Sequence, residues 1–258
     1  MPGLFVDGSE HRVDGLVIRN PRDADWCRLD ARNCQPRTTL WIRQIILHTT
    51  QATPPSHARP GRGPGGGARR TLDAWRRNPS ASAAHLVIDS DGTVACLCDL
   101  ATTETLRAAL GDPGSVGIAM YQEPDGSVYE SVYDAAVALV PALCAQLGIQ
   151  FQIPRLPHRN EPLRRLVDGG RDCVGVFGHR DRALRGVTDP GDDIFRRLAA
   201  AGAERYDHSA GEDLAIWKGR QRTLNHHHGA SLAVDGIPGP ATVAALRAAG
   251  HAIGIWAL

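Results

Sequence analysis

The sequence predicts an α/β (α+β) fold: a mixed central β-sheet flanked by helices, followed by a small C-terminal helical module. Two observations predict the sheet domain. Short apolar runs such as residues 45–47 and 174–177 have the length and composition of buried strands. Residues 128–147 carry apolar side chains at helical spacing between those runs. Strands that alternate with helices and hairpins are typical of a layered sheet with covering helices.

The first part of the chain is polar and rich in turn-forming pairs. We expect residues 1–38 to form an N-terminal extension of short strands and loops. A buried strand is expected at 41–47, ending at His48. The Pro- and Gly-rich segment 54–70 is expected to lack regular structure, either as a functional lid or as a disordered loop. A short helix follows, with Thr71 as its N-cap.

The expected sheet domain spans residues 39–202 and continues with a hairpin, whose strands at 85–88 and 93–98 flank the Asp91-Gly92 turn. The remaining elements are strands at 115–121 and 174–177 and helices at 128–147 and 192–201. After Gly202 the sequence pattern changes from mixed strands and helices to helices alone. A separate module, 203–258, is expected to contain helices at 213–224 and 243–249, with a loop at 225–229.

Composition excludes several classes of protein. The 29 basic residues nearly balance the 28 acidic ones, which argues against a nucleic-acid partner bound through phosphate contacts. No apolar run reaches the length of a membrane span. The N-terminus has no apolar core of a signal peptide, so we expect synthesis in the cytoplasm.

The six cysteines form no CxxC pair. Cys96 and Cys98 stand two apart in a strand-like run, which predicts that they share one face of the sheet. Metal binding, oxidation and reduced buried thiols are all compatible with that spacing. Reduced buried thiols are the favoured interpretation.

Three residues have the types and positions that metal chemistry requires. His48 and His179 each end a predicted buried strand, and Asp189 lies ten residues after His179 in a turn before a helix. Two imidazoles and one carboxylate form the ligand set of a catalytic zinc, with a fourth position left for water. Spacing alone favours the plainer alternative, in which the histidines are ordinary polar caps of strands.

Several motifs favour a metal site over ordinary polar caps. They occur in the order IILHTT (45–50), SAAHLVIDSDGTV (82–94), SVGI (115–118), and GHRD (178–181) with TDPG (188–191). With them, residues 41–198 resemble the zinc-dependent N-acetylmuramoyl-L-alanine amidases of type 2, a family that includes the peptidoglycan recognition proteins. The resemblance implies that His48, His179 and Asp189 hold Zn²⁺. It also implies hydrolysis of the amide that joins N-acetylmuramic acid to L-alanine in peptidoglycan.

The chain departs from that family at catalytic positions. By the same resemblance, Ala119 stands where a general-base glutamate is expected, and Val187 where a lysine would stabilise the oxyanion. A general base contributes about 10²–10⁴-fold and an oxyanion donor about 10²–10³-fold. Three explanations stay open: a weakly active or binding-only relative, an engineered loss at position 119, or substitute groups. Glu123 would be a substitute if its strand continued, although a solvated residue beside a turn is favoured.

Other residues are candidates for substitute groups or for substrate contacts. Arg107, His85 and Tyr121 are further substitute candidates. Arg107 is expected to contact a stem-peptide carboxylate or muramyl oxygens, because arginine suits carboxylates. For His85, a packed, hydrogen-bonded histidine is favoured over a role in lining the substrate groove.

The C-terminal module contains the run VDGIPGPAT (234–242). It resembles the small helical peptidoglycan-binding module found beside cell-wall hydrolases, and a helical cap packed on the main domain is the alternative. The expected partner is therefore peptidoglycan, met in the cell wall or periplasm after export or lysis. A lysin or an antibacterial toxin would cut it, a recognition protein would only bind it, and a regulated relative would have an immunity protein as partner.

Overall fold

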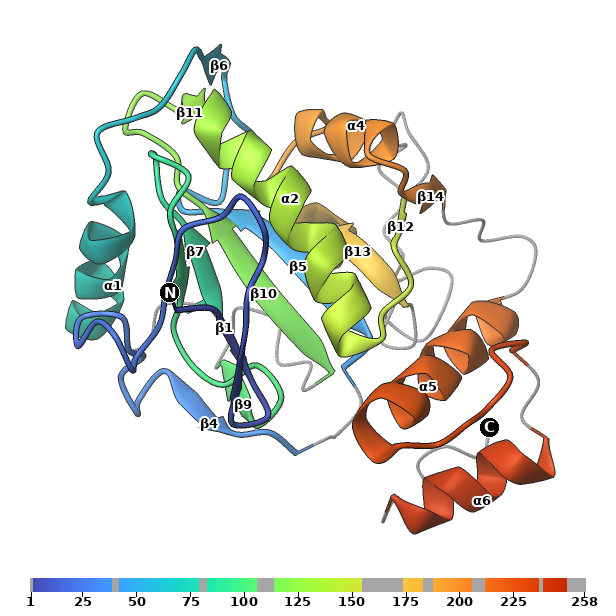
Figure 1. The fold of residues 1–258 in the computed structure, drawn as a ribbon. Helices are drawn as coiled ribbons and strands as arrows, with labels where there is room; N and C mark the ends of the chain where they lie inside the picture. The colour runs from blue at the N-terminus through green and yellow to red at the C-terminus, as the bar shows by residue number, and fades with distance from the viewer. Residues whose placement is uncertain are drawn as a thin grey trace.

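The computed structural model describes residues 2–38, 42–78, 83–105, 114–154, 174–182, 188–205, 212–236 and 239–249. At its centre lies a six-stranded mixed sheet, as the sequence predicts (Figure 1). Its strands, in spatial order, are β13 (Gly175–Gly178), β5 (Gln44–Thr49), β10 (Ser115–Met120), β7 (Leu86–Ile88), β8 (Val94–Cys96) and β3 (Ile18–Arg19). The first four are parallel, β8 runs antiparallel to β7, and β3 runs parallel to β8.

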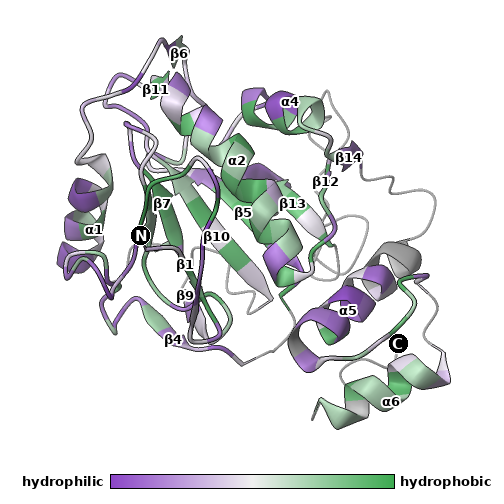
Figure 2. Cartoon of the chain, in the orientation of Figure 1, coloured by the Kyte–Doolittle hydropathy of each residue, from purple (hydrophilic) through white to green (hydrophobic). Residues whose placement is uncertain are grey.

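The central strands are buried along their whole length. Every residue of β5 and of β10 is buried, which explains the continuous apolar runs in the sequence. Figure 2 shows these strands as mainly hydrophobic. The strand predicted at 41–47 is present as a buried strand, but it begins at Gln44 and continues through His48 to Thr49.

Helices cover both faces of the sheet. On one face lie α2 (Glu130–Leu147) and α4 (Asp193–Ala200), whose buried residues form one core with strand residues such as Ile45 and Ile118. On the other face α1 (Gly67–Arg77) contributes Ala68 and Leu72 to a smaller core that includes Ala119. The short α3 (His179–Arg182) follows β13, and β12 (Gln152–Ile153) pairs with β14 (Glu204–Arg205). The layered α/β architecture is thus confirmed.

The N-terminal residues belong to the sheet domain. The hairpin β1 (Leu4–Val6) and β2 (Ser9–His11) places Leu4 and Val6 in the core beneath α2. Strand β3 supplies the sixth strand of the central sheet, and β4 (Cys34–Pro36) pairs with β9 (Thr103–Thr105). The extension expected at 1–38 therefore has a structural role that the sequence did not reveal.

The Pro- and Gly-rich segment is more ordered than expected. Strand β6 (Ala58–Arg59) pairs with β11 (Val128–Tyr129). Helix α1 begins at Gly67, whose N–H donates to the Asp89 carboxylate at 2.8 Å. Thr71 lies inside the helix and donates to the Gly67 carbonyl, so its prediction as the N-cap was wrong. Asp89, from the hairpin, satisfies the helix start instead.

The two neighbouring cysteines do not share a face. Strand β8 ends at Cys96, so the alternation of side chains stops there. Cys96 lies in the core beneath α2, whereas Cys98 packs against the core beneath α1. Burial raises the pKa of Cys96 to about 12, and the five described cysteines are free thiols.

The C-terminal residues form two helices, α5 (Glu212–His228) and α6 (Pro240–Ala248). The prediction of a loop at 225–229 was wrong, because α5 continues to His228. Gln221 of α5 bonds the Asp235 carboxylate and the Gly236 N–H, each at 2.8 Å, and so fixes the turn before α6. Helix α5 packs against α2. In the described part of the chain, no helix has both the length and the apolar character of a bilayer span.

The integration of the N-terminal residues predicts a contrast between Ile18, the first residue of β3, and Val17 just before it. Ile18 is 2% exposed in the core, and Val17 is 53% exposed. Ile18→Ala should lower the free energy of unfolding by about 2–5 kcal/mol, whereas Val17→Ala should change it by less than about 0.5 kcal/mol. Urea denaturation measures both. Equal losses would show that β3 is not part of the core.

Candidate metal centre

His48 and His179 lie side by side at the carboxyl ends of two parallel strands. In the ladder between β5 and β13, Leu47 pairs with Gly178, so the next residues on the two strands are neighbours. Side chains alternate along β5, and Ile45 and Leu47 enter the core beneath α2. His48 therefore emerges on the opposite face. The two imidazole centroids are 4.7 Å apart.

Asp189 completes the group from a turn far along the chain. Its carboxylate is fully buried, and one oxygen lies 3.0 Å from Nδ1 of His179. The other oxygen accepts the Thr49 N–H at 3.1 Å and lies 4.0 Å from Nδ1 of His48. The Arg180 N–H donates to the Asp189 carbonyl at 3.1 Å, which ties the turn to the start of α3.

The geometry of this triad, His48, His179 and Asp189, suits a metal ion. Its potential ligand atoms all lie within 4.8 Å of one another, and both imidazoles direct Nδ1 toward the carboxylate. Tetrahedral zinc with ligands at about 2.0–2.2 Å needs donors roughly 3.3 Å apart, so a small contraction is sufficient. No cysteine belongs to a possible metal group in the described part of the chain.

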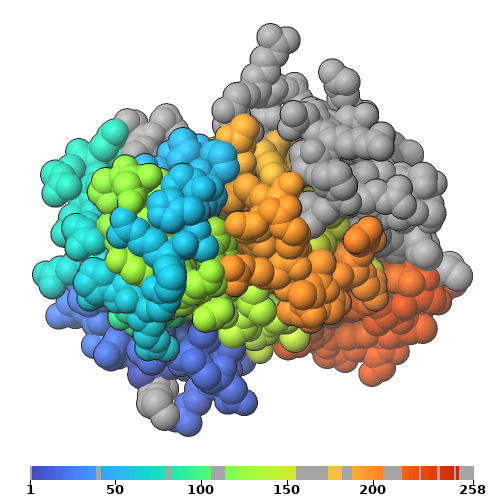
Figure 3. All heavy atoms as spheres, turned by 90° about the horizontal axis from the view of Figure 1, so that it is seen from above, coloured from blue at the N-terminus to red at the C-terminus, as the bar shows by residue number. Residues whose placement is uncertain are grey.

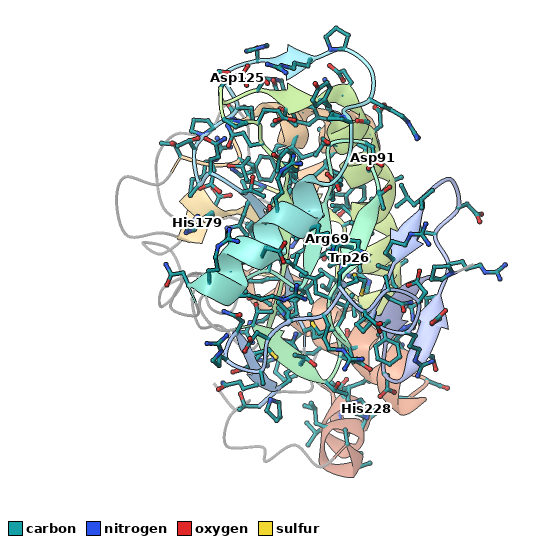
Figure 4. The ribbon with its side chains drawn as sticks, turned by 90° about the vertical axis from the view of Figure 1, so that its left-hand side faces the viewer. Trp26, Arg69, Asp91, Asp125, His179 and His228 are labelled. Carbon is teal, nitrogen blue, oxygen red and sulfur yellow. The ribbon has the colours of Figure 1, made fainter. Side chains whose placement is uncertain are left out.

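The loop that follows β5 and the turn that carries Asp189 lie next to each other near the triad. The loop after β5 lies against the turn that carries Asp189, since a Cβ on Gly191 would lie 3.4 Å from Pro54. Seen from above, this loop and α4 cover neighbouring parts of one face (Figure 3). In Figure 4, seen from the side of α1, the labelled His179 is not hidden behind that helix. In Figure 1, α1 lies on the side of β7, whereas β13, which leads into His179, lies at the other end of the row that it forms with β5, β10 and β7.

Ala119 lies next to the triad. It is the register partner of His48 in the pairing of β10 with β5, and it is 3% exposed. Adjacent residues in register on parallel strands point to the same face, so the methyl group of Ala119 lies beside the His48 imidazole. A methyl group offers neither a base nor an acid at that place.

The substitutes considered for the missing base lie elsewhere. Strand β10 ends at Met120, and Glu123 lies in a turn closed by the Gly126 N–H on its carbonyl. The condition that would have placed Glu123 on the strand face is therefore not met. Tyr121 packs its ring against Gly67, where an added Cβ would approach within 2.6 Å, and accepts a hydrogen bond from Arg70 at 2.9 Å. Its phenol is held toward α1.

His85 is a buried, hydrogen-bonded histidine. It has no exposed surface, and Nδ1 accepts the Gly117 N–H at 2.9 Å. Nε2 lies 3.2 Å from the Thr103 carbonyl and 3.1 Å from the Arg37 guanidinium. Burial, reinforced by the Arg37 guanidinium, holds the pKa of His85 well below its usual value. The side chain presents no surface to a substrate.

Sequence reasoning overlooked Arg37, and two of the residues it selected cannot be placed. Arg107 and Val187 lie outside the described residues. Arg37 donates to the carbonyls of Leu100 and Thr103 at 3.0 and 2.8 Å, which anchors β4 beside His85. Its guanidinium also lies 3.1 Å from Nε2 of His85. An arginine whose partners are backbone carbonyls and a distant histidine has no sequence motif that would reveal it.

The burial of neutral His85 predicts a pH dependence of stability. Below its ordinary pKa of 6.5, the unfolded chain binds a proton at His85 that the folded chain does not bind. This group alone should lower the free energy of unfolding by about 1.4 kcal/mol per pH unit on acidification. His85→Asn, which keeps an acceptor for Gly117, should lack this contribution. Urea titrations at pH 7, 6 and 5 measure the difference, and parallel curves would contradict it.

Comparison with known proteins identifies the family. A family model described as N-acetylmuramoyl-L-alanine amidase matches residues 37–192, more than half of the chain, and this range includes the whole triad. No curated protein matches the chain. A crystal structure of Drosophila peptidoglycan recognition protein SD is similar, with 17% identity and a TM-score of 0.44, covering 73% of this chain and 96% of that one. By the family match, the chain belongs to the N-acetylmuramoyl-L-alanine amidase family.

Proposed function

We propose that the chain is a zinc amidase that hydrolyses the amide between N-acetylmuramic acid and the L-alanine of a peptidoglycan stem peptide. The observation that carries this proposal is the triad itself, with three donors and a fourth position left for water or substrate. Zinc bound there would polarise the amide carbonyl and make a bound water acidic enough to act near neutral pH.

The chain's own residues orient the centre. The Thr49 N–H holds one oxygen of Asp189, which fixes the carboxylate relative to both imidazoles. Asp181 accepts the Gly178 N–H, which supports the turn that leads into His179. Such partners keep ligands in place at little cost when the metal binds. The centre is therefore organised before any ion arrives.

The proposed enzyme lacks a proton-transfer group at the position beside His48. Ala119 occupies the position beside His48, and the described alternatives, Tyr121 and Glu123, are held away from it. Loss of a positioned base costs about 10²–10⁴-fold. We therefore propose slow turnover, in a lysin or an antibacterial toxin that meets its substrate in the cell wall or periplasm after export or lysis.

The same observation favours a second candidate, a peptidoglycan recognition protein that binds without cutting. In that case the triad region would still contact the muramyl peptide, and Ala119 would mark the loss of catalysis. A protein partner, such as an immunity protein, would suit a toxin better than a recognition protein. Activity on purified sacculi separates the two candidates.

Restoring the carboxylate tests the amidase directly. Purified sacculi are incubated with the zinc-loaded chain, and released L-alanine amino termini are counted by mass spectrometry. Ala119→Glu should raise the rate by about 10²-fold or more, because it returns a base beside the centre. His179→Ala and chelation should abolish release.

The experiment includes a control variant and an outcome that would contradict the proposal. His57→Ala removes an exposed histidine outside the triad and should leave the rate unchanged. If the parent and Ala119→Glu both bind sacculi but release no amino termini, the chain is a recognition protein and the enzyme proposal fails.

A further inference from the structure

A second concave site lies between the sheet domain and the C-terminal helices. The groove has a volume of about 570 Å³ and runs between the carboxyl end of α2 and the carboxyl-terminal part of α5. These elements lie together in Figure 1. The groove is on the face of the sheet covered by α2, whereas the triad is on the face covered by α1. It is therefore a site separate from the metal centre.

The two walls of the groove differ in chemistry. The wall from α2 and the residues after it is apolar, with Pro141, Ala145, Ile149 and Phe151. The wall from α5 carries polar groups, chiefly Arg222. A mainly apolar groove of about 300–1,000 Å³ with a few polar groups is the usual form of a small-ligand site.

Arg222 is the charged group of this groove and forms no direct ion pair with a carboxylate among the described residues. Its guanidinium is half-buried and makes one long contact, 3.4 Å, to the Gln150 amide oxygen. Gln150 in turn donates to Glu204 at 2.9 Å, so the carboxylate is held behind the amide. Burial lowers the pKa of Arg222, and the charge of Glu204 offsets only part of this effect. A half-buried guanidinium gains most from an anion that pairs with it.

The other polar groups at the groove add no negative charge. His226 stands on the α5 wall, and burial, reinforced by nearby His11 from β2, lowers its pKa. The Asn225 amide is already bonded to the backbone of Leu232 through both its nitrogen and its oxygen. The unmatched charge is therefore that of Arg222, and the complementary ligand has an anionic end and small apolar groups.

We propose that the groove between α2 and α5 binds the free carboxylate end of a short peptide with small apolar side chains, such as the alanine end of a stem peptide. The carboxylate would pair with Arg222, and the methyl groups would lie along the wall of Pro141 and Ile149. Only the choice of a stem peptide rests on the proposed function. Because the groove is remote from the triad, it would hold the polymer while another stem reaches the metal centre, which raises the local substrate concentration.

Calorimetry with the full chain tests this proposal. The probes are the pentapeptide L-Ala-γ-D-Glu-L-Lys-D-Ala-D-Ala and the same peptide with a C-terminal amide, added to chelator-treated protein that cannot cut. The acid should bind about 10–100-fold more tightly than the amide, the range expected for a charge-assisted pair. Arg222→Gln should remove that difference, and Arg77→Gln, an exposed arginine on α1, should retain it.

A second variant guards against loss of folding. Ala145 is exposed, so Ala145→Trp fills the groove without entering the core and should also weaken binding of the acid. Equal affinity for acid and amide, or wild-type affinity in Arg222→Gln, would overturn the proposal. Activity and binding are separate readouts. If the chain never cuts sacculi but shows this Arg222-dependent preference, the amidase proposal fails and the groove proposal stands. If it cuts sacculi without this preference, only the groove proposal fails.

Discussion

The parallel pairing of β5 with β13 is the constraint on which the rest of the site depends. Register places His179 beside His48, and the same strand end presents the Thr49 N–H to Asp189. A slip of one residue would turn His48 into the core beneath α2 and remove the site. Both strands are buried, so the apolar core that stabilises the fold also fixes the geometry of the triad.

The strand on the other side of β5 is the basis of the proposal that this chain holds a metal but turns over slowly. Strand β10 pairs with β5 along its whole length and brings Ala119 to His48. One neighbour of β5 thus brings His179 to the triad, and the other brings a methyl group beside His48. This small apolar residue packs among the alanines beneath α1.

Sequence reasoning recovered the features that local pattern encodes. Buried runs identified the strands, and residues at their ends identified the triad. It failed where a distant contact decides the outcome. The contact with Asp89 lets α1 begin at Gly67 and not at Thr71. Strand β10 ends at Met120, so Glu123 is not on its face. Helix α5 is longer than the predicted helix 213–224, and Gln221 on it bonds the turn that follows. None of these has a local signature, because each depends on residues brought together only by folding.

The central claim is that the chain holds a metal at one defined place. Anomalous diffraction at the zinc edge, from crystals grown with equimolar zinc, tests it most directly. The account predicts one strong peak about 2.0–2.2 Å from Nδ1 of His48, Nδ1 of His179 and a carboxylate oxygen of Asp189. No peak within bonding distance of these atoms, or a zinc ion bound only at the histidines that end α5, would contradict it.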